Sequence, residues 1–216
     1  MNTPKESKIR LSFVVFGIIV GIIGILHGAA ELLHGNTLVA GGKIPAMPEN
    51  WPNDEFYTLM KGAPVFSLLS DIPYYVLGLL AISVSIAFIV FSSKFFKLNA
   101  KGIGLFALFS IGIFLFGAGE GTPIAVCLPM IITGFLSLFT KQKERSESSK
   151  RVNLIGFNDF YWLQIFSWVL FFPGLFVMSF YQEIPQWLFI FDFMIMPISI
   201  IGTMIFGFRY DRTIDF

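Results

Sequence analysis

LSFVVFGIIVGIIGILHGAAELL, residues 11–33, is an apolar run that contains one acidic side chain and no lysine or arginine. About 20 predominantly apolar residues are enough for a helix to cross the hydrocarbon core of a bilayer. Lipid offers the backbone no hydrogen-bond partner, so a spanning run must be helical unless it belongs to a closed barrel. The chain has no series of short alternating strands that a barrel would need. The run therefore predicts an all-α membrane protein.

The composition of the whole chain favours the same class. Of its 216 residues, 55% are hydrophobic and 13% are charged, whereas a soluble domain carries roughly 25% charged residues. The net charge of +1 creates no field that would attract nucleic acid, so we expect no nucleic-acid partner. The single cysteine, Cys127, excludes an intrachain disulfide, and we expect it to be a buried apolar residue.

The apolar runs predict one membrane domain, residues 1–216, with six transmembrane helices. The predicted spans are about 11–33, 64–91, 102–119, 123–140, 159–181 and 187–208. An extracytoplasmic loop, 35–62, is expected to contain a short surface helix at 53–60, and a cytoplasmic linker, 141–158, is too polar to pack. Pro73, which falls inside the second predicted span, removes a helical hydrogen bond and predicts a bend there.

The basic residues orient these spans. Thirteen of the fifteen Lys and Arg residues fall at the amino end, in residues 94–101, in the linker or in the tail, and only Lys43 and Lys61 fall on the opposite side. Short cytoplasmic loops carry an excess of Lys and Arg. The pattern predicts a multi-pass protein of the inner (plasma) membrane with both termini in the cytoplasm.

Several polar side chains reach the outer boundary of the predicted spans. Counting about 20 residues per crossing brings all the acids that fall in or at a span to this side. The candidate site residues are His27, Glu31, His34, Asp71, Glu120 and Asp192. They either converge on an outward-facing polar pocket or are ordinary boundary residues, an alternative that applies especially to Asp71 and Glu120. Asp192 is flanked by apolar residues and needs a partner from another helix.

Four glycines form a smooth stripe along the first span. Gly17, Gly21, Gly24 and Gly28 follow one another in steps of four, three and four, and small residues at this spacing let another helix approach closely. We expect the partner to be a membrane helix, either of this chain or of another protein. Glu31 continues the stripe at 100° per residue and should face protein, in contact with Asp192, Asp71 or Glu120.

His27 and Glu31 are four residues apart and could share a divalent metal ion such as Zn, Mn or Fe. His34 lies about 10.5 Å of helix rise from His27, so one ion cannot readily bind both histidines. The chain has no HExxH motif. A His–carboxylate hydrogen-bonded network and independent surface roles are the alternatives to a metal site.

Four short motifs follow one another along the chain: His27-Gly28-x-x-Glu31, Gly35-Asn36, Trp51-Pro52 and Glu55-Phe56. Together they resemble an uncharacterised group of bacterial integral membrane proteins in which a first span ending in HGxxE precedes a Trp-Pro loop. A later glycine-rich run that ends in prolines is similar to residues 117–123 here, so the resemblance covers roughly the first two-thirds of the chain.

The group tends to have a polar amide where this chain has His34, and Glu120 lies outside its pattern. The resemblance therefore implies a shared site at His27 and Glu31, and it implies no activity.

Three functions fit these features. The first is a small transporter or cation/proton-coupled permease with an outward-facing His–carboxylate site. The second is a membrane-embedded enzyme, with a His–carboxylate or a metal centre, that acts on a lipid or apolar substrate at the outer leaflet. The third is a non-catalytic partner subunit that binds another protein through the glycine stripe.

Overall fold

The computed structural model describes residues 7–38, 43–45, 64–66, 69, 71–116, 122–140, 147–180 and 186–213. Within these ranges, the backbone alone is described for residues 30, 43–45, 64–66, 122–123, 170–180 and 186–193. The α-helices are α1 (Lys8–Leu32), α3 (Tyr74–Val90), α4 (Ala100–Phe116), α5 (Thr122–Phe139), α6 (Glu147–Phe180) and α7 (Gln186–Asp211). A π-helix, η1 (Phe91–Phe95), continues α3. The strands β1 (Lys43–Pro45) and β2 (Pro64–Phe66) pair antiparallel, so the fold is helical apart from this short sheet.

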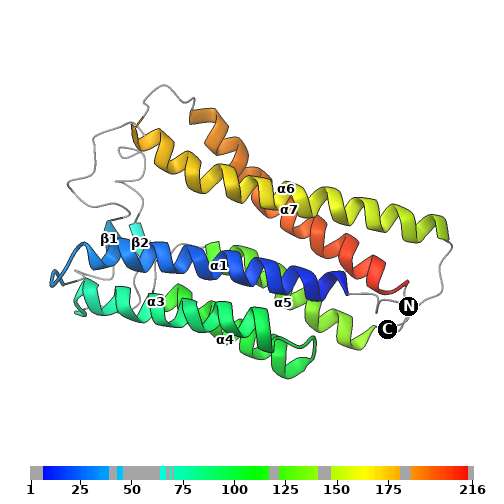
Figure 1. The fold of residues 1–216 in the computed structure, drawn as a ribbon, viewed down its shortest axis with the longest axis horizontal. Coiled ribbons are helices and arrows are strands. Elements are labelled where there is room, and N and C mark those ends of the chain that lie inside the picture. Colours follow the sequence, from blue (N-terminus) through cyan, green and yellow to red (C-terminus); the bar gives the residue numbers. More distant parts are fainter. Residues whose placement is uncertain are drawn as a thin grey trace.

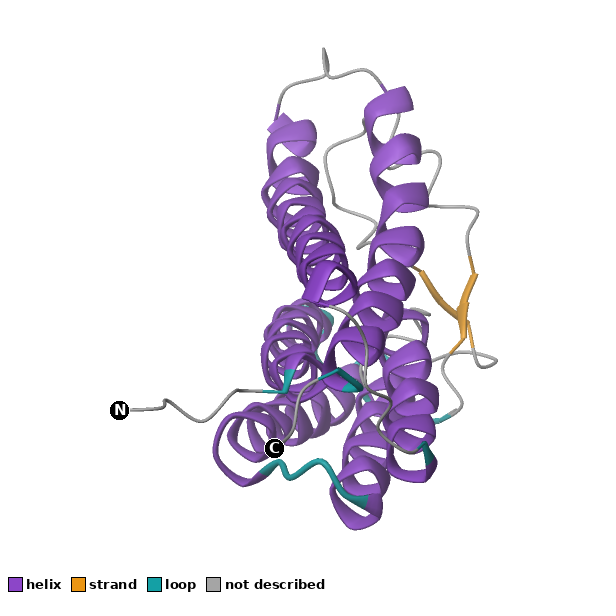
Figure 2. Cartoon of the chain, turned by 90° about the vertical axis from the view of Figure 1, so that its right-hand side faces the viewer, coloured by secondary structure: helices purple, strands orange, loops and turns teal. Residues whose placement is uncertain are grey.

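The first helix, α1, occupies the middle of the molecule. It contacts α3, α4 and α5 on one side and α7 on the other. The α6–α7 pair lies apart from the group of α1, α3, α4 and α5 over much of its length (Figures 1 and 2). Both termini lie at the same end of the bundle (Figure 1). The arrangement makes α1 the helix against which the rest of the chain packs.

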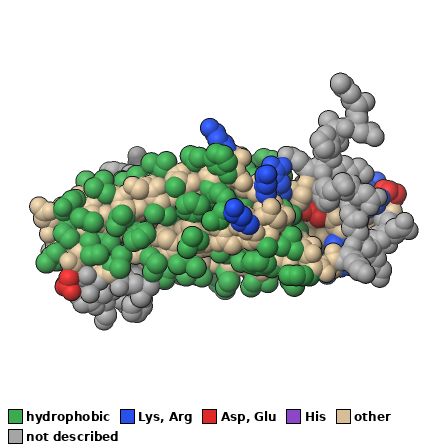
Figure 3. All heavy atoms as spheres, turned by 90° about the horizontal axis from the view of Figure 1, so that it is seen from below, with side chains coloured by type: hydrophobic (Ala, Val, Ile, Leu, Met, Phe, Trp, Pro, Cys, Tyr) green, Lys and Arg blue, Asp and Glu red, His purple; other side chains and the backbone are tan. Residues whose placement is uncertain are grey.

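Within the described residues, two helical stretches are long and apolar enough to cross a membrane by length and composition: Lys8–Ala29 and Tyr74–Phe95. The apolar helices Ala100–Phe116 and Ile124–Phe139 are shorter. The structure therefore supports the helical class and two of the six predicted spans. Hydrophobic side chains also cover much of the surface, with Lys and Arg side chains lying mainly toward the end that holds the termini (Figure 3).

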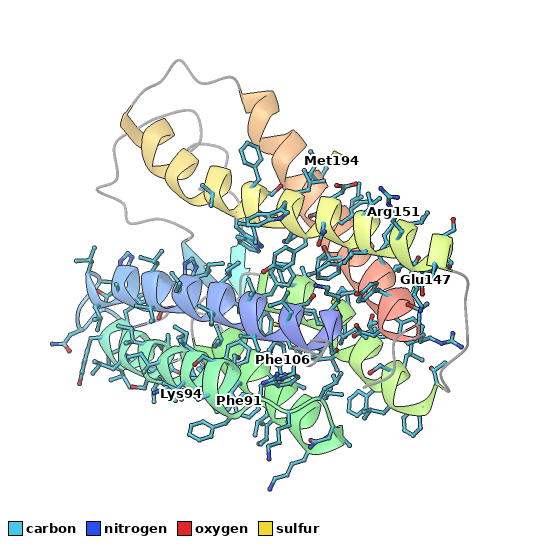
Figure 4. All side chains as sticks on the ribbon, turned by 45° about the vertical axis from the view of Figure 1, so that its right-hand side comes forward. Phe91, Lys94, Phe106, Glu147, Arg151 and Met194 are labelled. Carbon is cyan, nitrogen blue, oxygen red and sulfur yellow. The ribbon has the colours of Figure 1, made fainter. Side chains whose placement is uncertain are left out.

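The core beside α1 is built largely from phenylalanine. Phe13 stacks on Phe96, with ring centroids 4.7 Å apart, and meets Phe106 edge-on at the same distance. Phe88 also meets Phe106 edge-on. Phe91, whose side chain lies with Phe106 on the α3–α4 side of the bundle (Figure 4), is buried in the same cluster. Aromatic pairs of this geometry add to the stabilisation that burial alone provides.

The glycine stripe of α1 packs against α3 and η1 of the same chain, along what we call the α1–α3 seam. The seam consists of Gly17, Gly21, Gly24 and Gly28 on α1, Gly78, Ser85 and Ile89 on α3, and Ser92 on η1. A Cβ atom added at Gly28 would lie 2.7 Å from the carbonyl oxygen of Gly78, and one added at Gly78 would lie 2.5 Å from the carbonyl oxygen of Gly28. Only glycine permits this separation of the two backbones.

Asp211, at the end of α7, closes the bundle at the other end of α1. Its carboxylate accepts hydrogen bonds from the Ser7 hydroxyl at 2.5 Å and from the backbone N–H groups of Lys8 and Ile9 at 2.8 and 3.0 Å. The first N–H groups of a helix have no partner within the helix, and its amino terminus carries partial positive charge. Asp211 therefore caps α1 from a position more than 200 residues away in sequence.

Three predicted boundaries need correction. Pro73 does not bend the second span, because α3 begins after it and Pro73 has an extended backbone at the helix start. The linker 141–158 is helical from Glu147 onward, since α6 buries Asn153 and Phe157 there. The fifth predicted span, about 159–181, consequently begins inside α6, which starts at Glu147. α4 ends at Phe116 and α5 begins at Thr122, on either side of the predicted junction at 117–123, whereas residues 117–121 and the predicted surface helix at 53–60 lie outside the described residues.

We predict that Gly28→Ala destabilises the protein by about 1–3 kcal/mol, the usual cost of overpacking, because the added methyl group would meet Gly78. Gly104→Ala is the matched control: no atom lies within 4 Å of its added Cβ, and alanine gains about 1 kcal/mol in helix propensity. Thermal unfolding in mild detergent, followed by the reaction of buried Cys127 with a fluorescent thiol reagent, measures both changes. Equal effects of the two substitutions would contradict the close approach of α1 and α3.

We also predict that Asp211→Ala lowers stability by about 0.5–2 kcal/mol, the range for loss of a helix cap. The exposed acid Glu147, which pairs with Lys150 at the surface, provides the control substitution Glu147→Ala, with little expected effect. Unfolding in the same thiol assay would separate the two variants. An unchanged unfolding temperature for Asp211→Ala would refute the cap.

Asp211 should also make stability depend on pH. Burial raises the pKa of Asp211, and the hydrogen bonds from Ser7, Ile9 and Lys8 and the charge of Lys8 lower it again in part. Between the ordinary Asp pKa of about 3.9 and the raised pKa, the folded chain binds more protons than the unfolded chain. The stability of the wild-type protein relative to Asp211→Asn should therefore fall as pH rises through this window.

Candidate functional site

The end of α1 is joined to the start of α3 by a hydrogen-bonded turn. The N–H groups of His34 and Gly35 donate to the carbonyls of Glu31 and Leu32, at 3.0 and 3.2 Å. Gly35 has φ +60°, a left-handed conformation that suits glycine just after a helix. The N–H of Tyr75 in turn donates to the carbonyl of Gly35 at 3.0 Å. The turn thus ends α1 and satisfies the first N–H groups of α3.

Glu31 lies on the buried side of α1, one turn before its end. The side chain is only 6% exposed, and neither carboxyl oxygen has a hydrogen-bond partner among the residues that the structure describes. It interacts electrostatically with His27, one turn earlier on α1, and with Tyr74 at the start of α3. Burial without hydrogen-bond donors favours the neutral, protonated form of a carboxyl group. The predicted inward direction of Glu31 is confirmed.

His34 contacts the same tyrosine from the turn. Its ring lies 4.8 Å from the ring of Tyr74, tilted by 31°. Burial lowers the pKa of the half-buried His34 below its ordinary value, which favours a neutral imidazole near pH 7. Tyr74 therefore lies between a neutral histidine and a buried carboxyl group, while half-buried His27 approaches the carboxyl group from α1.

Tyr74 is the member of this group that the sequence analysis missed. The sequence predicts Tyr74 inside the second span, because the apolar run begins ten residues earlier, at Pro64. Its position directly after a proline was the available signal, since proline is common at helix starts and tyrosine is enriched at membrane boundaries. Its approach to α1 depends on how the two helices cross at Gly28 and Gly78, which sequence spacing does not reveal.

The other predicted acids do not join this group in the part of the chain that the structure describes. Asp71 precedes α3 with an exposed side chain and φ +63°, so it is turned toward the surroundings. Glu120 lies outside the described residues, and Asp192 lies in α7 with a side chain that is not described. The expected contacts of Glu31 with these three acids are replaced by contacts with His27 and Tyr74.

A metal centre has no complete ligand set among the described residues, where no group of three His, Cys, Asp or Glu residues could hold an ion. The pair of His27 and Glu31 supplies two ligand types on one helix face, whereas protein metal sites commonly use three or four side chains. A buried carboxyl group can also bind and release a proton, and Glu31 offers this chemistry.

A second polar cluster, also missed from the sequence, lies between α6 and α7. Gln164 is fully buried and accepts a hydrogen bond from the Ser199 hydroxyl. That hydroxyl also lies 2.9 Å from the carbonyl of Met196, and Thr203 donates to the carbonyl of Ser199 at 2.8 Å. These contacts join the two long helices to each other, and we assign the cluster a packing role.

Comparison with known proteins gave no match: no protein-family model matches the sequence, and no curated protein or solved structure does so significantly. The resemblance to membrane proteins with an HGxxE first span therefore stays a prediction. The function must be argued from the chemistry of the site.

We predict that Glu31→Met raises stability at neutral pH by about 1–3 kcal/mol, because it replaces a buried carboxyl group without hydrogen-bond partners by an apolar chain of similar size. The exposed Asp71 supplies the control Asp71→Asn, expected to change stability by less than about 0.5 kcal/mol. Thermal unfolding in detergent measures both. A strongly destabilised Glu31→Met protein would show that the carboxyl group makes a stabilising hydrogen bond.

Proposed function

We propose that this chain is a six-span protein of the inner membrane, with both termini in the cytoplasm, that couples proton movement to the transport of a small cation. In this proposal Glu31 is the group that takes up the proton on the outward side, and His27, Tyr74 and His34 surround it. The observation that carries the proposal is the buried Glu31 carboxyl group with no hydrogen-bond partner at the junction of α1 and α3.

The membrane setting is supported by the surface of the helices. Large apolar side chains are exposed on every α-helix, for example Leu79 on α3, Leu108 on α4, Trp162 on α6 and Ile198 on α7. Soluble monomers rarely expose apolar side chains so extensively. The position of both termini at one end of the bundle (Figure 1) is what an even number of crossings requires. The distribution of Lys and Arg assigns that end to the cytoplasm.

Proton coupling follows from what ionisation would do to Glu31. A carboxylate taken out of water without donors costs several kcal/mol, whereas the protonated group costs much less. The charged form therefore favours an arrangement in which water or a cation reaches Glu31, and the neutral form favours the packed arrangement. A proton and a cation that compete for one carboxyl group would be exchanged across the membrane by alternation between these two arrangements.

The other two functions have less support. The metal-dependent form of the enzyme hypothesis finds no group of three His, Cys, Asp or Glu residues that could hold an ion among the described residues. The partner-subunit hypothesis used the glycine stripe as a binding surface, and the stripe is occupied by α3 and η1 of the same chain. A buried ionisable group inside a helical membrane protein is a common feature of proton and ion pathways.

We predict that everted membrane vesicles containing the wild-type chain, loaded with protons by respiration, release them when Na⁺, K⁺ or Li⁺ chloride is added. Glu31→Gln should abolish the release, since an amide binds neither the proton nor the cation in exchange. Acridine orange fluorescence reports the pH gradient. Vesicles with Asp71→Asn should behave as wild type because the Asp71 side chain is exposed.

Labelling by dicyclohexylcarbodiimide gives an independent check, because this apolar reagent modifies protonated carboxyl groups in membranes. Mass spectrometry should find the label on Glu31, with less labelling as pH rises, and none in Glu31→Gln. Release in Glu31→Gln vesicles at the wild-type rate, or no release from wild-type vesicles with any of the three cations, would refute the proposal.

A further inference from the structure

Two buried serine hydroxyls on the α1–α3 seam lack hydrogen-bond partners. Ser85 is fully buried and Ser92 is 1% exposed, and within the described part of the chain the oxygen of neither forms a hydrogen bond. Ser83, two residues before Ser85, instead donates to the carbonyl of Leu79 at 2.7 Å, as serines in apolar helices usually do. An unpaired hydroxyl in apolar surroundings costs about 1–3 kcal/mol. Both orphan hydroxyls are therefore unusual, and both face glycines of α1.

The two hydroxyls and the Glu31 carboxyl group are evenly spaced along one line. Ser85 packs on Gly24 and Ser92 packs on Gly17. Gly17, Gly24 and Glu31 are separated by steps of seven residues, about 10.5 Å of helix rise each. The seam thus has the Glu31 carboxyl group at its outer end, the Ser85 hydroxyl one step of seven residues further along α1, and the Ser92 hydroxyl one step beyond that.

Ser92, the last of these three groups, lies in an irregular helix. Ser92 belongs to η1, where the backbone leaves α-helical hydrogen bonding and the N–H of Phe96 donates to the carbonyl of Phe91 at 2.8 Å. π-helical turns inside α-helices occur frequently at functional sites. Beyond Ser92 the side chains of Ser93 and Lys94 are exposed, so the seam ends at the basic end of the bundle. It connects the buried carboxyl group with the side that the positive charges assign to the cytoplasm.

We propose that the α1–α3 seam is the route by which the proton held by Glu31 moves toward the cytoplasm, through Ser85 and then Ser92. This inference rests on the proposed function. The proton leaves the Glu31 carboxyl oxygen for a water molecule, and each serine oxygen accepts one proton while its own hydrogen passes to the next water. Every hydroxyl is restored after the transfer. Each gap of about 10.5 Å needs roughly three bridging waters at hydrogen-bond spacing.

The occupant is a proton rather than a metal cation because the seam is uncharged and offers few ligands. Even a methyl group at Gly17, Gly21 or Gly24 would overlap α3 or η1, so neither water nor a metal ion fits between the helices as they pack, and transfer requires α1 and α3 to separate. Two neutral hydroxyls supply too few oxygen ligands for an ion that prefers six or more, such as Ca²⁺. A proton needs no such ligand set, only single waters that link the hydroxyls while the helices are apart.

The test measures proton flux into proteoliposomes that contain the full chain and the pH-sensitive dye pyranine, driven by an outward gradient of Na⁺, K⁺ or Li⁺, which exchange would convert into proton uptake. Ser85→Ala and Ser92→Ala should each slow the flux at least tenfold, and Glu31→Gln should abolish it. Ser83→Ala, on the same helix but exposed and bonded to Leu79, should leave it unchanged. Thermal unfolding of each variant shows that it is folded, since loss of an orphan hydroxyl should not destabilise the protein.

The outcomes separate the route from the function. Flux that is lost in Glu31→Gln but unchanged in Ser85→Ala and Ser92→Ala would overturn the route and leave the role of Glu31 standing. Equal slowing by Ser83→Ala would also overturn the route. Wild-type flux no greater than that of empty liposomes would overturn both proposals.

Discussion

The close approach of α1 and α3 is the constraint on which the rest of the structure depends. The backbones meet at Gly28 and Gly78, where each carbonyl oxygen faces the other glycine. Lipid provides little hydrophobic driving force for helix association, so van der Waals packing and Cα–H···O contacts between such close backbones must stabilise the pair. Once this pair is fixed, the opposite face of α1 presents Phe13, Phe16 and Val20 to the remaining helices.

The same approach explains why the polar site is buried. Glu31 lies one turn beyond Gly28, on the face of α1 that α3 covers, and Tyr74 lies one turn before Gly78. A wider separation of α1 from α3 would let water reach the carboxyl group. If α3 began well before Tyr74, the turn at His34 would no longer lead from the end of α1 to the start of α3. Burial of Glu31 is thus a consequence of the glycine crossing. The crossing stabilises the fold while the carboxyl group destabilises it, a combination typical of functional sites.

Local periodicity was enough to predict some of these features. The direction of Glu31 follows from the phase of the glycine stripe, and the break between α4 and α5 follows from glycine and proline at residues 117–123. Features that depend on contacts between distant segments were not predictable. Hydrophobicity alone cannot distinguish a proline at a helix start from one inside a span. The second span was therefore predicted to begin at about residue 64, whereas α3 begins at Tyr74. The charged start of α6 is helical because Asn153 and Phe157 are buried there, Phe157 against Gly207 of α7, which composition does not show.

The cap that Asp211 provides has a consequence for how the chain is made. The N–H groups of Lys8 and Ile9 have no access to this acceptor until α7 has been synthesised, because it lies more than 200 residues later. At about 5–20 residues per second, synthesis of that length takes roughly 10–40 seconds. During this interval these two N–H groups depend on other acceptors, such as water. Synthesis of α7, rather than formation of α1, is the event that joins the two ends of the bundle.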